Sequence, residues 1–434
     1  MAGVTEGRRI AALVLWAASR GRRLDLALGE AGATLPPRER RWVQEATYGV
    51  ARFRGRLDFL LDLHLNKGLE SLGPRILDLL RLGAYQLLFM DGVPPYAAIS
   101  QTVDQVRALA GGGVGRMANA VLRSLAREGG AVERFPDFET DPLSHLSTWG
   151  SHPDWLVGRW LRRWEPGAVR MLVDWNNAPP PLYVRPLGIT LEEGARRLAE
   201  EGVDARIPGD GVPCLRLEDG TNPARLLEAF PGIVQDPGAA LVTLYADPPR
   251  GVEVFDLCAA PGGKALALAG EGFYVLAADR SFSRSKVLGQ NLERVGGSVR
   301  LVVADARQPP FTEARFVLLD VPCSGTGTLR RHPDARWRLS PKMLGGLVEL
   351  QREMMEAAGR LIPPGGFLVY STCTLEEEEN ERQVEDFLAR HPGFSLEETR
   401  AVNPSFVDEK GCLRVQPQDA GYDGAFAARL VKGS

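Results

Sequence analysis

Two of the five cysteines stand in contexts that suit a reactive thiol. Cys323 lies in the segment DVPCSGTG (residues 320–327), and Cys373 lies in YSTCT (residues 370–374). Cys214 and Cys412 lack such polar, loop-like contexts, so we expect them to be buried and inert, as most free cysteines are. A cysteine thiolate is a strong nucleophile, so the two motifs indicate covalent chemistry if the fold brings them together.

A loop of small residues, DLCAAPGGK, precedes a helical segment (residues 256–264). Small residues let the backbone approach a ligand closely, and a helix N-terminus offers free N–H groups. The loop lacks the GxGxxG pattern of NAD sites and is not a Walker loop. Asp279 suits ribose hydroxyls and Asp305 an adenine amino group, which favours S-adenosylmethionine (SAM). The candidate cofactor residues are Cys258, Ala259, Ala260, Pro261, Gly262, Gly263, Lys264, Asp279, Asp305 and Asp320.

These residues all follow short apolar runs that alternate with helical segments. This alternation predicts a doubly wound α/β domain with a mostly parallel sheet, in which ligands bind outside the carboxyl ends of the strands. Cys323 and Cys373 would then end neighbouring strands and face one another across a small site. The five runs cover residues 252–257, 274–278, 299–303, 316–319 and 367–370, and they end at Cys258, Asp279, Asp305, Asp320 and residues 371–373.

Two thiols beside a methyl donor suggest methylation of a pyrimidine at carbon 5. That carbon is not nucleophilic until a thiolate adds to carbon 6. A base then removes the carbon 5 proton and the thiolate leaves by elimination. One cysteine suffices for attack, so the second is expected to help resolve the adduct, and the residues alone do not say which does which. Asp320 is placed to bond the Watson–Crick edge of an extruded cytosine.

Residues 1–135 are expected to form an all-α domain. Leu57, Leu60, Leu61, His64 and Leu65 recur at the spacing of one helix face, with His64 in a structural role. Breaks are expected at residues 91–95 and 111–113. Residues 1–60 hold 11 arginines against 6 acidic residues. This excess fits either a solvated helix face or a surface for a polyanion.

A small α+β unit is expected between the helices and the α/β domain. Residues 135–181 are rich in Trp and Pro and indicate linker helices. Residues 182–184 and 213–217 are strand-like, and Thr190 is a suitable cap for a helix over residues 191–201. The sequence therefore predicts three parts, which cover residues 1–135, 136–235 and 236–434.

Composition narrows the class of protein further. The chain has 434 residues with a net charge of −3, so a nucleic-acid surface must be a local patch. An odd number of cysteines, no CxxC and only five histidines exclude a disulfide framework and a metal-ligand cluster, and indicate a cytoplasmic location. No run approaches the roughly 20 apolar residues of a membrane span.

These motifs together resemble the bacterial RsmB (Sun/Fmu) family, and the resemblance covers nearly the whole chain. The catalytic motifs are CAAPGGK (258–264), DVPCSGTG followed by RRHPD (330–334) and Trp337, and YSTC (370–373) followed by Glu378, Glu379 and Asn380. The helical segments at residues 80–88, 93–98 and 119–123 are similar to those of NusB-like RNA-binding domains.

The resemblance implies a SAM-dependent methyltransferase that forms 5-methylcytidine in 16S ribosomal RNA of the small subunit, acting as a cytoplasmic monomer without a metal. Its fold would be a NusB-like all-α domain, a small ferredoxin- or RRM-like α+β domain and a Rossmann-like α/β domain. Cys373 would be the nucleophile and Cys323 would assist release. Asp279 would hold the ribose, Asp305 the adenine side and Asp320 the methyl-donor or base side.

The chain departs from the family pattern at three places, one of which is a short loop between Lys264 and Asp279. Arg185-Pro186-Leu187 stands where the family more often has Arg followed by Val-Asn, and Ala425 replaces an expected aromatic residue. Two other functions remain open at this point. One is the same chemistry on tRNA or another RNA, and the other is a non-enzymatic RNA-binding or assembly factor whose methyltransferase fold has lost its activity. The second function is disfavoured because loss of activity should erode a catalytic motif, whereas Lys264, Cys323 and Cys373 are all present.

Overall fold

The computed structural model describes residues 3–218, 221 and 223–433 and divides into two compact units. Residues 1–2, 219–220, 222 and 434, which belong to the three expected ranges, lie outside the described residues. The helical unit comprises Met1–Ala178 and Leu329–Leu339, and the catalytic-side unit comprises Pro179–Thr328 and Ser340–Ser434.

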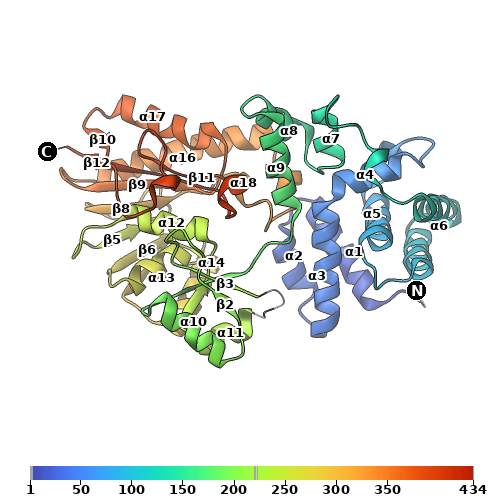
Figure 1. Cartoon of the computed structure of the whole chain (residues 1–434), viewed down its shortest axis with the longest axis horizontal. Coiled ribbons are helices and arrows are strands. Elements are labelled where there is room, and N and C mark those ends of the chain that lie inside the picture. Colours follow the sequence, from blue (N-terminus) through green and yellow to red (C-terminus); the bar gives the residue numbers. More distant parts are fainter. Residues whose placement is uncertain (1–2, 219–220, 222, 434) are drawn as a thin grey trace. The chain divides into compact units, whose positions relative to one another are not determined.

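The helical unit confirms the expected all-α architecture, since its described residues form no strand (Figure 1). Apolar faces of its first six helices share one core, in which Val14, Leu57, Leu80 and Leu122 are almost fully buried. The helices are α1 (Glu6–Ser19), α2 (Leu24–Ala31), α3 (Pro37–Arg52), α4 (Arg54–Asp62), α5 (Pro74–Phe89), α6 (Pro95–Glu128), α7 (Pro142–Thr148), α8 (Asp154–Leu161), α9 (Pro166–Asn177) and α15 (Ala335–Arg338).

Two expected boundaries in this unit need correction. The apolar pattern that runs through His64 and Leu65 outlasts its helix, because α4 ends at Asp62. The break expected at residues 111–113 is a kink within α6, where Gly111 has a φ of 83°. Only glycine adopts that conformation without strain, so the chain turns there and resumes as a helix.

The ferredoxin-like domain opens the second unit. Its antiparallel sheet has the order β2-β3-β1-β4. Thr190 caps the first helix as expected, accepting a bond from the Glu193 N–H at 3.2 Å. The expected strands at residues 182–184 and 213–217 are present, whereas β2, α11 and β4 were not anticipated. The elements are β1 (Tyr183–Pro186), α10 (Leu191–Glu200), β2 (Ala205–Arg206), β3 (Leu215–Leu217), α11 (Pro223–Ala229) and β4 (Gly232–Val234).

The large sheet of the same unit is mixed. Five parallel strands stand in the order β7-β6-β5-β8-β9, and antiparallel β12 continues the sheet beside β9. β10 and β11 both pair with β12. The strands are β5 (Val254–Asp256), β6 (Val275–Asp279), β7 (Val299–Val303), β8 (Phe316–Asp320), β9 (Phe367–Thr372), β10 (Phe394–Leu396), β11 (Leu413–Val415) and β12 (Ala425–Lys432).

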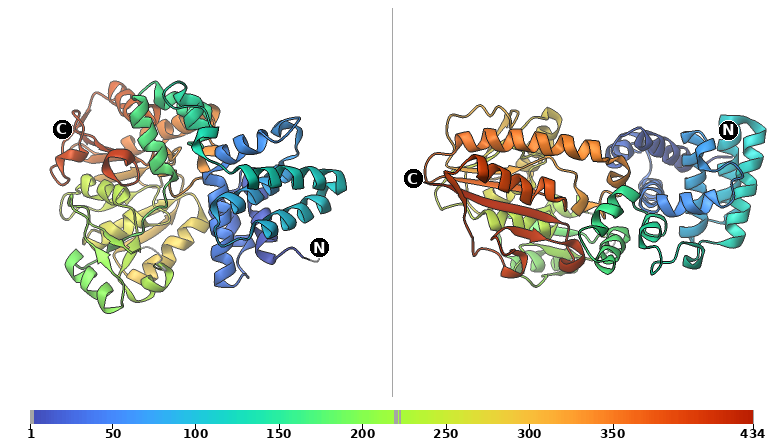
Figure 2. Two further views of the ribbon diagram at one scale, coloured as in Figure 1. Left: turned by 45° about the vertical axis from the view of Figure 1, so that its right-hand side comes forward. Right: turned by 90° about the horizontal axis from the view of Figure 1, so that it is seen from above.

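Helices cover both faces of this sheet, as expected for a doubly wound domain (Figure 2). One face packs against α12, α13 and α14, through residues such as Leu241 and Leu268. The other packs against α16 and α17, through residues such as Met355 and Phe387. The helices are α12 (Pro237–Ala246), α13 (Gly263–Gly270), α14 (Phe282–Val295), α16 (Pro341–Leu361), α17 (Glu381–Arg390) and the short α18 (Pro417–Ala420).

The strand order places one functional edge on the sheet. β5, β6 and β7 proceed in one direction, and β8 returns to the other side of β5. The order therefore reverses between β5 and β8, and the crevice at the carboxyl ends of such strands is where ligands bind in open α/β sheets.

Among the described residues, no helix has the length and apolar character of a membrane-spanning segment.

Candidate active site

The loops that follow β8 and β9 bring the two candidate thiols together. The strands pair in parallel, with Asp320 opposite Ser371, so both loops leave the same edge of the sheet. The sulfurs of Cys323 and Cys373 lie 3.3 Å apart, and both thiols are free. The backbone N–H of Cys373 also donates to the Cys323 sulfur at 3.3 Å. The fold thus places both sulfurs within reach of one small substrate atom group.

A buried carboxylate, Glu379, clamps the Cys323 loop. Its Oε1 accepts from the Ser324 N–H and from Gln351 Nε2, both at 2.8 Å, and its Oε2 accepts a short bond from the Ser324 hydroxyl. Burial raises the pKa of Glu379, while these hydrogen bonds favour its charged form. Glu379 was known from the sequence only as part of a motif, and its clamping contacts come from the structure.

Threonine side chains and a close backbone contact join the two loops. Thr326 Oγ1 lies 2.9 Å from Thr374 Oγ1 and accepts from the Leu375 N–H at 2.9 Å. At Gly327, a Cβ would meet the Cα of Gly424 at 2.7 Å, so only glycine lets the start of β12 approach this closely. The cysteine loops are therefore held rigidly by side chains that do not themselves bear the thiols.

Cys323 is biased towards its protonated form. The hydrogen bond with Cys373 is the largest cause that raises the pKa of the Cys323 thiol well above its ordinary range, and burial is the next. The neighbouring sulfur and burial therefore both raise the pKa of the Cys323 thiol.

An ion pair lies beside the thiols. Lys264 Nζ donates to Asp320 Oδ2 at 2.8 Å, and the Ser371 hydroxyl donates to Asp320 Oδ1 at 2.8 Å. Burial alone would lower the pKa of Lys264, but the charge and hydrogen bond of Asp320 outweigh it, with a further contribution from Cys373, and the pKa is raised. Lys264 therefore stays charged, and it links the glycine loop to the cysteine loops.

The glycine loop ends in a helix N-terminus open to a ligand. Gly262 has a φ of 110°, and a Cβ there would meet Leu288 at 2.7 Å, so the position requires glycine. No side chain caps α13, and a Cβ at Gly263 would meet nothing closer than Gln235 at 3.4 Å. The loop thus presents backbone N–H groups at the positive end of a short helix.

Asp279, at the end of β6, is buried and organises the glycine loop. It accepts from the Ala260 N–H at 3.2 Å and from the Ser281 N–H at 2.8 Å. Each carboxylate oxygen can accept a second bond, so capacity for a ribose hydroxyl remains. Asp279 therefore serves the loop's own shape in addition to its predicted ligand contact.

Asp305 follows β7, and its carboxylate is bonded to Arg307. Its carboxylate accepts from the N–H, Nε and Nη2 of Arg307 at 3.0, 3.1 and 2.8 Å. The side-chain hydrogen bond with Arg307 is the main cause that lowers its pKa to about 2. The Asp305 carboxylate is thus taken up by Arg307, while the backbone N–H of the preceding Ala304 donates to the Asp279 carbonyl at 3.2 Å.

Asp256, at the end of β5, was not selected from the sequence. It is almost wholly buried and accepts from the Cys258 N–H at 3.3 Å. Burial, and next the charge of Asp320, raise its pKa to about 7. The signal that could have found it is its position, because it is an acidic residue within a central strand that points at the glycine loop. Cys258 itself is held by this bond, and burial raises the pKa of its thiol.

Cys214 and Cys412 are buried, as expected. Cys214 is fully buried and Cys412 nearly so, and burial raises the pKa of each thiol to about 12. Within the described residues, no group of three or more His, Cys, Asp or Glu side chains could hold a metal ion.

Two curated relatives match this chain along almost its whole length. Ribosomal RNA small subunit methyltransferase B of Sodalis glossinidius is 33% identical over 423 residues, covering 92% of this chain and 93% of the relative. The protein of the same name from Vibrio vulnificus is 32% identical over 440 residues, covering 98% of this chain and 99% of the relative. This chain belongs to that methyltransferase family.

Family models match three stretches of this methyltransferase. Residues 243–431 match "16S rRNA methyltransferase RsmB/F", residues 5–127 match the NusB family, and residues 152–222 match an RsmF/B-like ferredoxin-like domain. The crystal structure of PH0851 resembles this methyltransferase with a TM-score of 0.79 at 26% identity, covering 98% of this chain and 99% of that one. NSun6 from Pyrococcus horikoshii with SFG shares the fold at a TM-score of 0.57 and 20% identity, covering 65% of this chain and 98% of that one.

Proposed function

We propose that this protein transfers a methyl group from SAM to carbon 5 of a cytidine in 16S ribosomal RNA, through a covalent adduct with Cys373. The observation that carries the proposal is the pair of free thiols 3.3 Å apart at the carboxyl edge of the sheet. A methyltransferase that acts on an already nucleophilic atom needs no thiol, whereas carbon 5 of a pyrimidine needs one.

The residues at the strand ends fit SAM. Gly263, where a Cβ would meet nothing closer than Gln235 at 3.4 Å, leaves room at an uncapped helix N-terminus suited to the methionine carboxylate. Asp279 would accept from the ribose hydroxyls. Asp305 would serve the adenine side only by sharing its carboxylate with Arg307. When bound, SAM supplies a methyl group on a positively charged sulfur.

Cys373 begins the reaction. Its sulfur, as the thiolate, forms a bond to carbon 6 of the cytosine, and the electron pair of the carbon 5–carbon 6 double bond makes carbon 5 nucleophilic. Carbon 5 then takes the methyl group as the bond between that methyl and the positively charged sulfur breaks, with the electron pair left on the sulfur of a neutral thioether. Asp320, fixed by Lys264 and Ser371, would accept from the cytosine amino group and hold the extruded base. A base must then remove the carbon 5 proton, which restores the double bond as the bond between sulfur and carbon 6 breaks.

Cys323 is suited to that later step. Its hydrogen bond with Cys373 is the largest cause of its raised pKa. Once Cys373 is bonded to carbon 6, its thiol is gone and this cause disappears. Loss of the Cys373 thiol removes one cause that raises the pKa of Cys323, while burial and the charge of Glu379 still raise it. In this proposal Cys373 acts first, by attacking carbon 6, and Cys323 acts only afterwards, when the carbon 5 proton is removed.

The three proposed parts divide the work. Residues 1–135 would supply RNA affinity, residues 136–235 would carry linker helices and an RNA-recognition sheet, and residues 236–434 would hold SAM and the thiols. Because the proposed substrate is ribosomal RNA and the chemistry needs no metal, we propose a metal-free monomer that works in the cytoplasm.

Substrate and product can be tested together. The full chain is incubated with methyl-labelled SAM and either 16S rRNA or tRNA, and the labelled RNA is digested to nucleosides. Labelled 5-methylcytidine from 16S rRNA is the expected product, and bisulfite sequencing locates the cytidine. Label in tRNA alone would assign the same chemistry to another RNA, and label on another atom would exclude the thiol route.

A further inference from the structure

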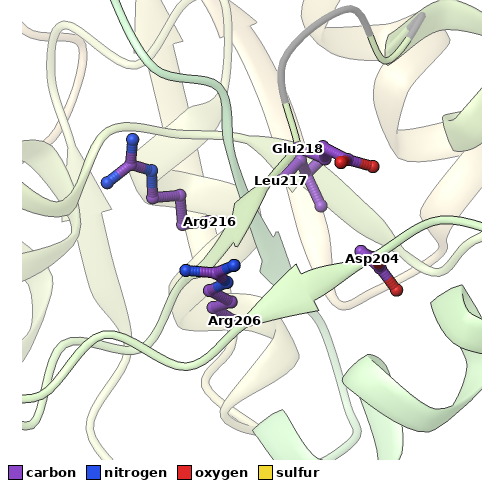
Figure 3. A pocket seen from close by; sticks show the side chains of 5 residues that line it. All are labelled: Asp204, Arg206, Arg216, Leu217 and Glu218. Carbon is purple, nitrogen blue, oxygen red and sulfur yellow. The ribbon is translucent and has the colours of Figure 1, made fainter.

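Two arginines stand side by side on the ferredoxin-like sheet. Arg206 on β2 and Arg216 on β3 are direct cross-strand partners, and both are exposed. They line a hollow of about 210 Å³ together with Asp204, Leu217 and Glu218. Figure 3 shows the two arginine side chains next to each other, with the carboxylates of Asp204 and Glu218 turned away from them.

The sheet leaves only this half of one face open. Val184, Leu215 and Leu217 point to the helix-covered side and form its small core with Leu198. On the other side, Tyr183 pairs with Arg216 across β1 and β3 but is buried within the core of the methyltransferase domain. The face that carries no helix is therefore covered at β1 and open at β2 and β3.

The open half is fixed relative to the SAM loop. Arg185 on β1 is buried and donates to Thr243 at 2.6 Å and to Gln235 at 3.2 Å, and it also pairs with Glu271. Arg294 on α14 donates to the Gly232 carbonyl at 2.9 Å. These contacts dock the ferredoxin-like sheet on the methyltransferase domain, so Arg206 and Arg216 keep a set position beside the catalytic fold.

The carboxylates of Asp204 and Glu218 line the same hollow but do not pair with the two arginines. Neither Arg206 nor Arg216 makes a hydrogen bond or an ion pair through its side chain in the described part of the chain. Arg196 and Arg197 on α10, in the same domain, both pair with Glu193. Like charges directly opposite on adjacent strands destabilise a sheet. An anion between the two guanidinium groups would remove that repulsion.

We propose that Arg206 and Arg216 form a clamp for a backbone phosphodiester of the RNA substrate, an inference that rests on the proposed function. Guanidinium groups present paired N–H donors that match phosphate oxygens. A four-stranded sheet with helices on one side only is also a known platform for single-stranded RNA. The clamp would hold the RNA strand on the ferredoxin-like domain while a cytidine is extruded.

The test is a salt titration of binding to a fluorescent 16S rRNA fragment that wild type methylates. R206Q/R216Q should bind about tenfold more weakly than wild type. Its slope of log affinity against log salt should be shallower by about 0.7–0.9, because the contact with one phosphate is lost. R196Q/R197Q removes the same charge from the same domain and should keep the wild-type slope. SAM affinity, measured by calorimetry, should be unchanged in both.

The outcomes separate the clamp from the proposed function. A wild type that methylates the fragment, together with an R206Q/R216Q variant of unaltered slope, overturns the clamp alone, as does an equal change in both double variants. A wild type that neither binds nor methylates RNA overturns both. If R206Q/R216Q loses its folded circular dichroism, R206K/R216K serves instead. R206K/R216K should keep the wild-type salt slope because its positive charges remain. It should still bind RNA more weakly, because lysine lacks the paired N–H donors of a guanidinium group.

Discussion

Cys323 and Cys373 are neighbours with different surroundings, and this difference predicts distinct mutant behaviour. Cys373→Ala should form no covalent adduct and essentially no product. Cys323→Ala should still attack and transfer the methyl group, then stall, so protein-linked RNA should survive denaturing electrophoresis. The opposite pattern would reverse the two roles, and full turnover in both single variants would remove the thiol mechanism. Cys214→Ala, at a fully buried inert thiol, is the matched control.

The reactivity of Cys323 towards an alkylating reagent tests the influence of Cys373 without any RNA. Because Cys373 is the largest cause of the raised pKa of Cys323, its removal should lower that pKa. Cys323 in Cys373→Ala should therefore be alkylated faster at pH 8 than in wild type. Mass spectrometry after a short iodoacetamide pulse measures this, and an unchanged rate would mean that burial alone controls the thiol.

Asp256 should give stability a pH dependence of definite sign. Its folded pKa is raised to about 7, against an ordinary value of about 3.9 when unfolded. Between these values the folded protein holds a proton that the unfolded chain has released, so stability falls as pH rises from about 4 to 7. Urea unfolding at pH 5 and pH 7.5 should show a smaller difference for Asp256→Asn than for wild type.

Asp305 is the control for that measurement. Its pKa is lowered to about 2, so its contribution is complete above about pH 4, and it is lost only on going below that. Asp305→Asn should therefore leave the difference between pH 5 and pH 7.5 unchanged. An equal effect of the two substitutions would show that Asp256 is not the group responsible.

Asp279 joins the shape of the glycine loop to the predicted ribose contact. A hydrogen bond to a charged acceptor is worth about 1.5–3 kcal/mol, so Asp279→Ala should weaken SAM binding by roughly 10- to 150-fold. Asp279→Asn keeps an acceptor for the Ala260 or Ser281 N–H and should lose less. Calorimetry decides this, and unchanged affinity in Asp279→Ala would take the residue out of the site.

At the scale of elements, the junction of the glycine loop with α13 depends on one backbone conformation. Gly262→Ala places a Cβ 2.7 Å from Leu288 at a φ of 110°, so it should cost about 1–3 kcal/mol of unfolding free energy and weaken SAM binding. Gly289→Ala, inside α14 with its nearest contact at 3.5 Å, should be neutral or stabilising. Equal stability of the two variants, measured by urea unfolding, would contradict this view of the loop.

The strands that carry the site were predictable because their sequences are locally unambiguous. β5 to β9 are short apolar runs that end at polar or small residues, and each observed strand begins and ends within two residues of its expected range. Their parallel order then follows from the alternation with helices. The meeting of Cys323 and Cys373 could likewise be expected, since both end strands of one sheet.

The other elements lack such a signal. β2 has two residues and β4 three, too few for a period of two to show. β12 mixes alanines with apolar and basic residues and is buried on both faces over most of its length, so it shows no alternation. The clamp by Glu379 and the loop contacts of Asp279 depend on chain segments meeting in space, which spacing along the sequence does not reveal.

At the scale of the molecule, the chain crosses between its units more often than the three expected ranges suggest. Leu329–Leu339, directly after the Cys323 loop, belongs to the helical unit. Within that unit, buried Arg336 donates to the Ser151 carbonyl at 3.0 Å and to Asn177 at 2.9 Å, and Trp337 donates to the Ala51 carbonyl at 2.6 Å. Removal of residues 1–130 would strip the partners of Trp337, so truncation cannot isolate an RNA-binding role.

Charge substitutions on α3 test that role without disturbing the segment Leu329–Leu339. Arg38 and Arg41 are exposed one turn apart and have no ion pair among the described residues, whereas Arg22 and Arg23 pair with Glu30 and Asp25. If the Arg-rich start binds RNA, R38Q/R41Q should make the salt dependence of RNA binding shallower by about 1.4–1.8 in log–log slope and leave SAM affinity intact. R22Q/R23Q removes equal charge and should change the slope less, because those arginines already face carboxylates. An unaltered slope in R38Q/R41Q would favour a merely solvated helix face.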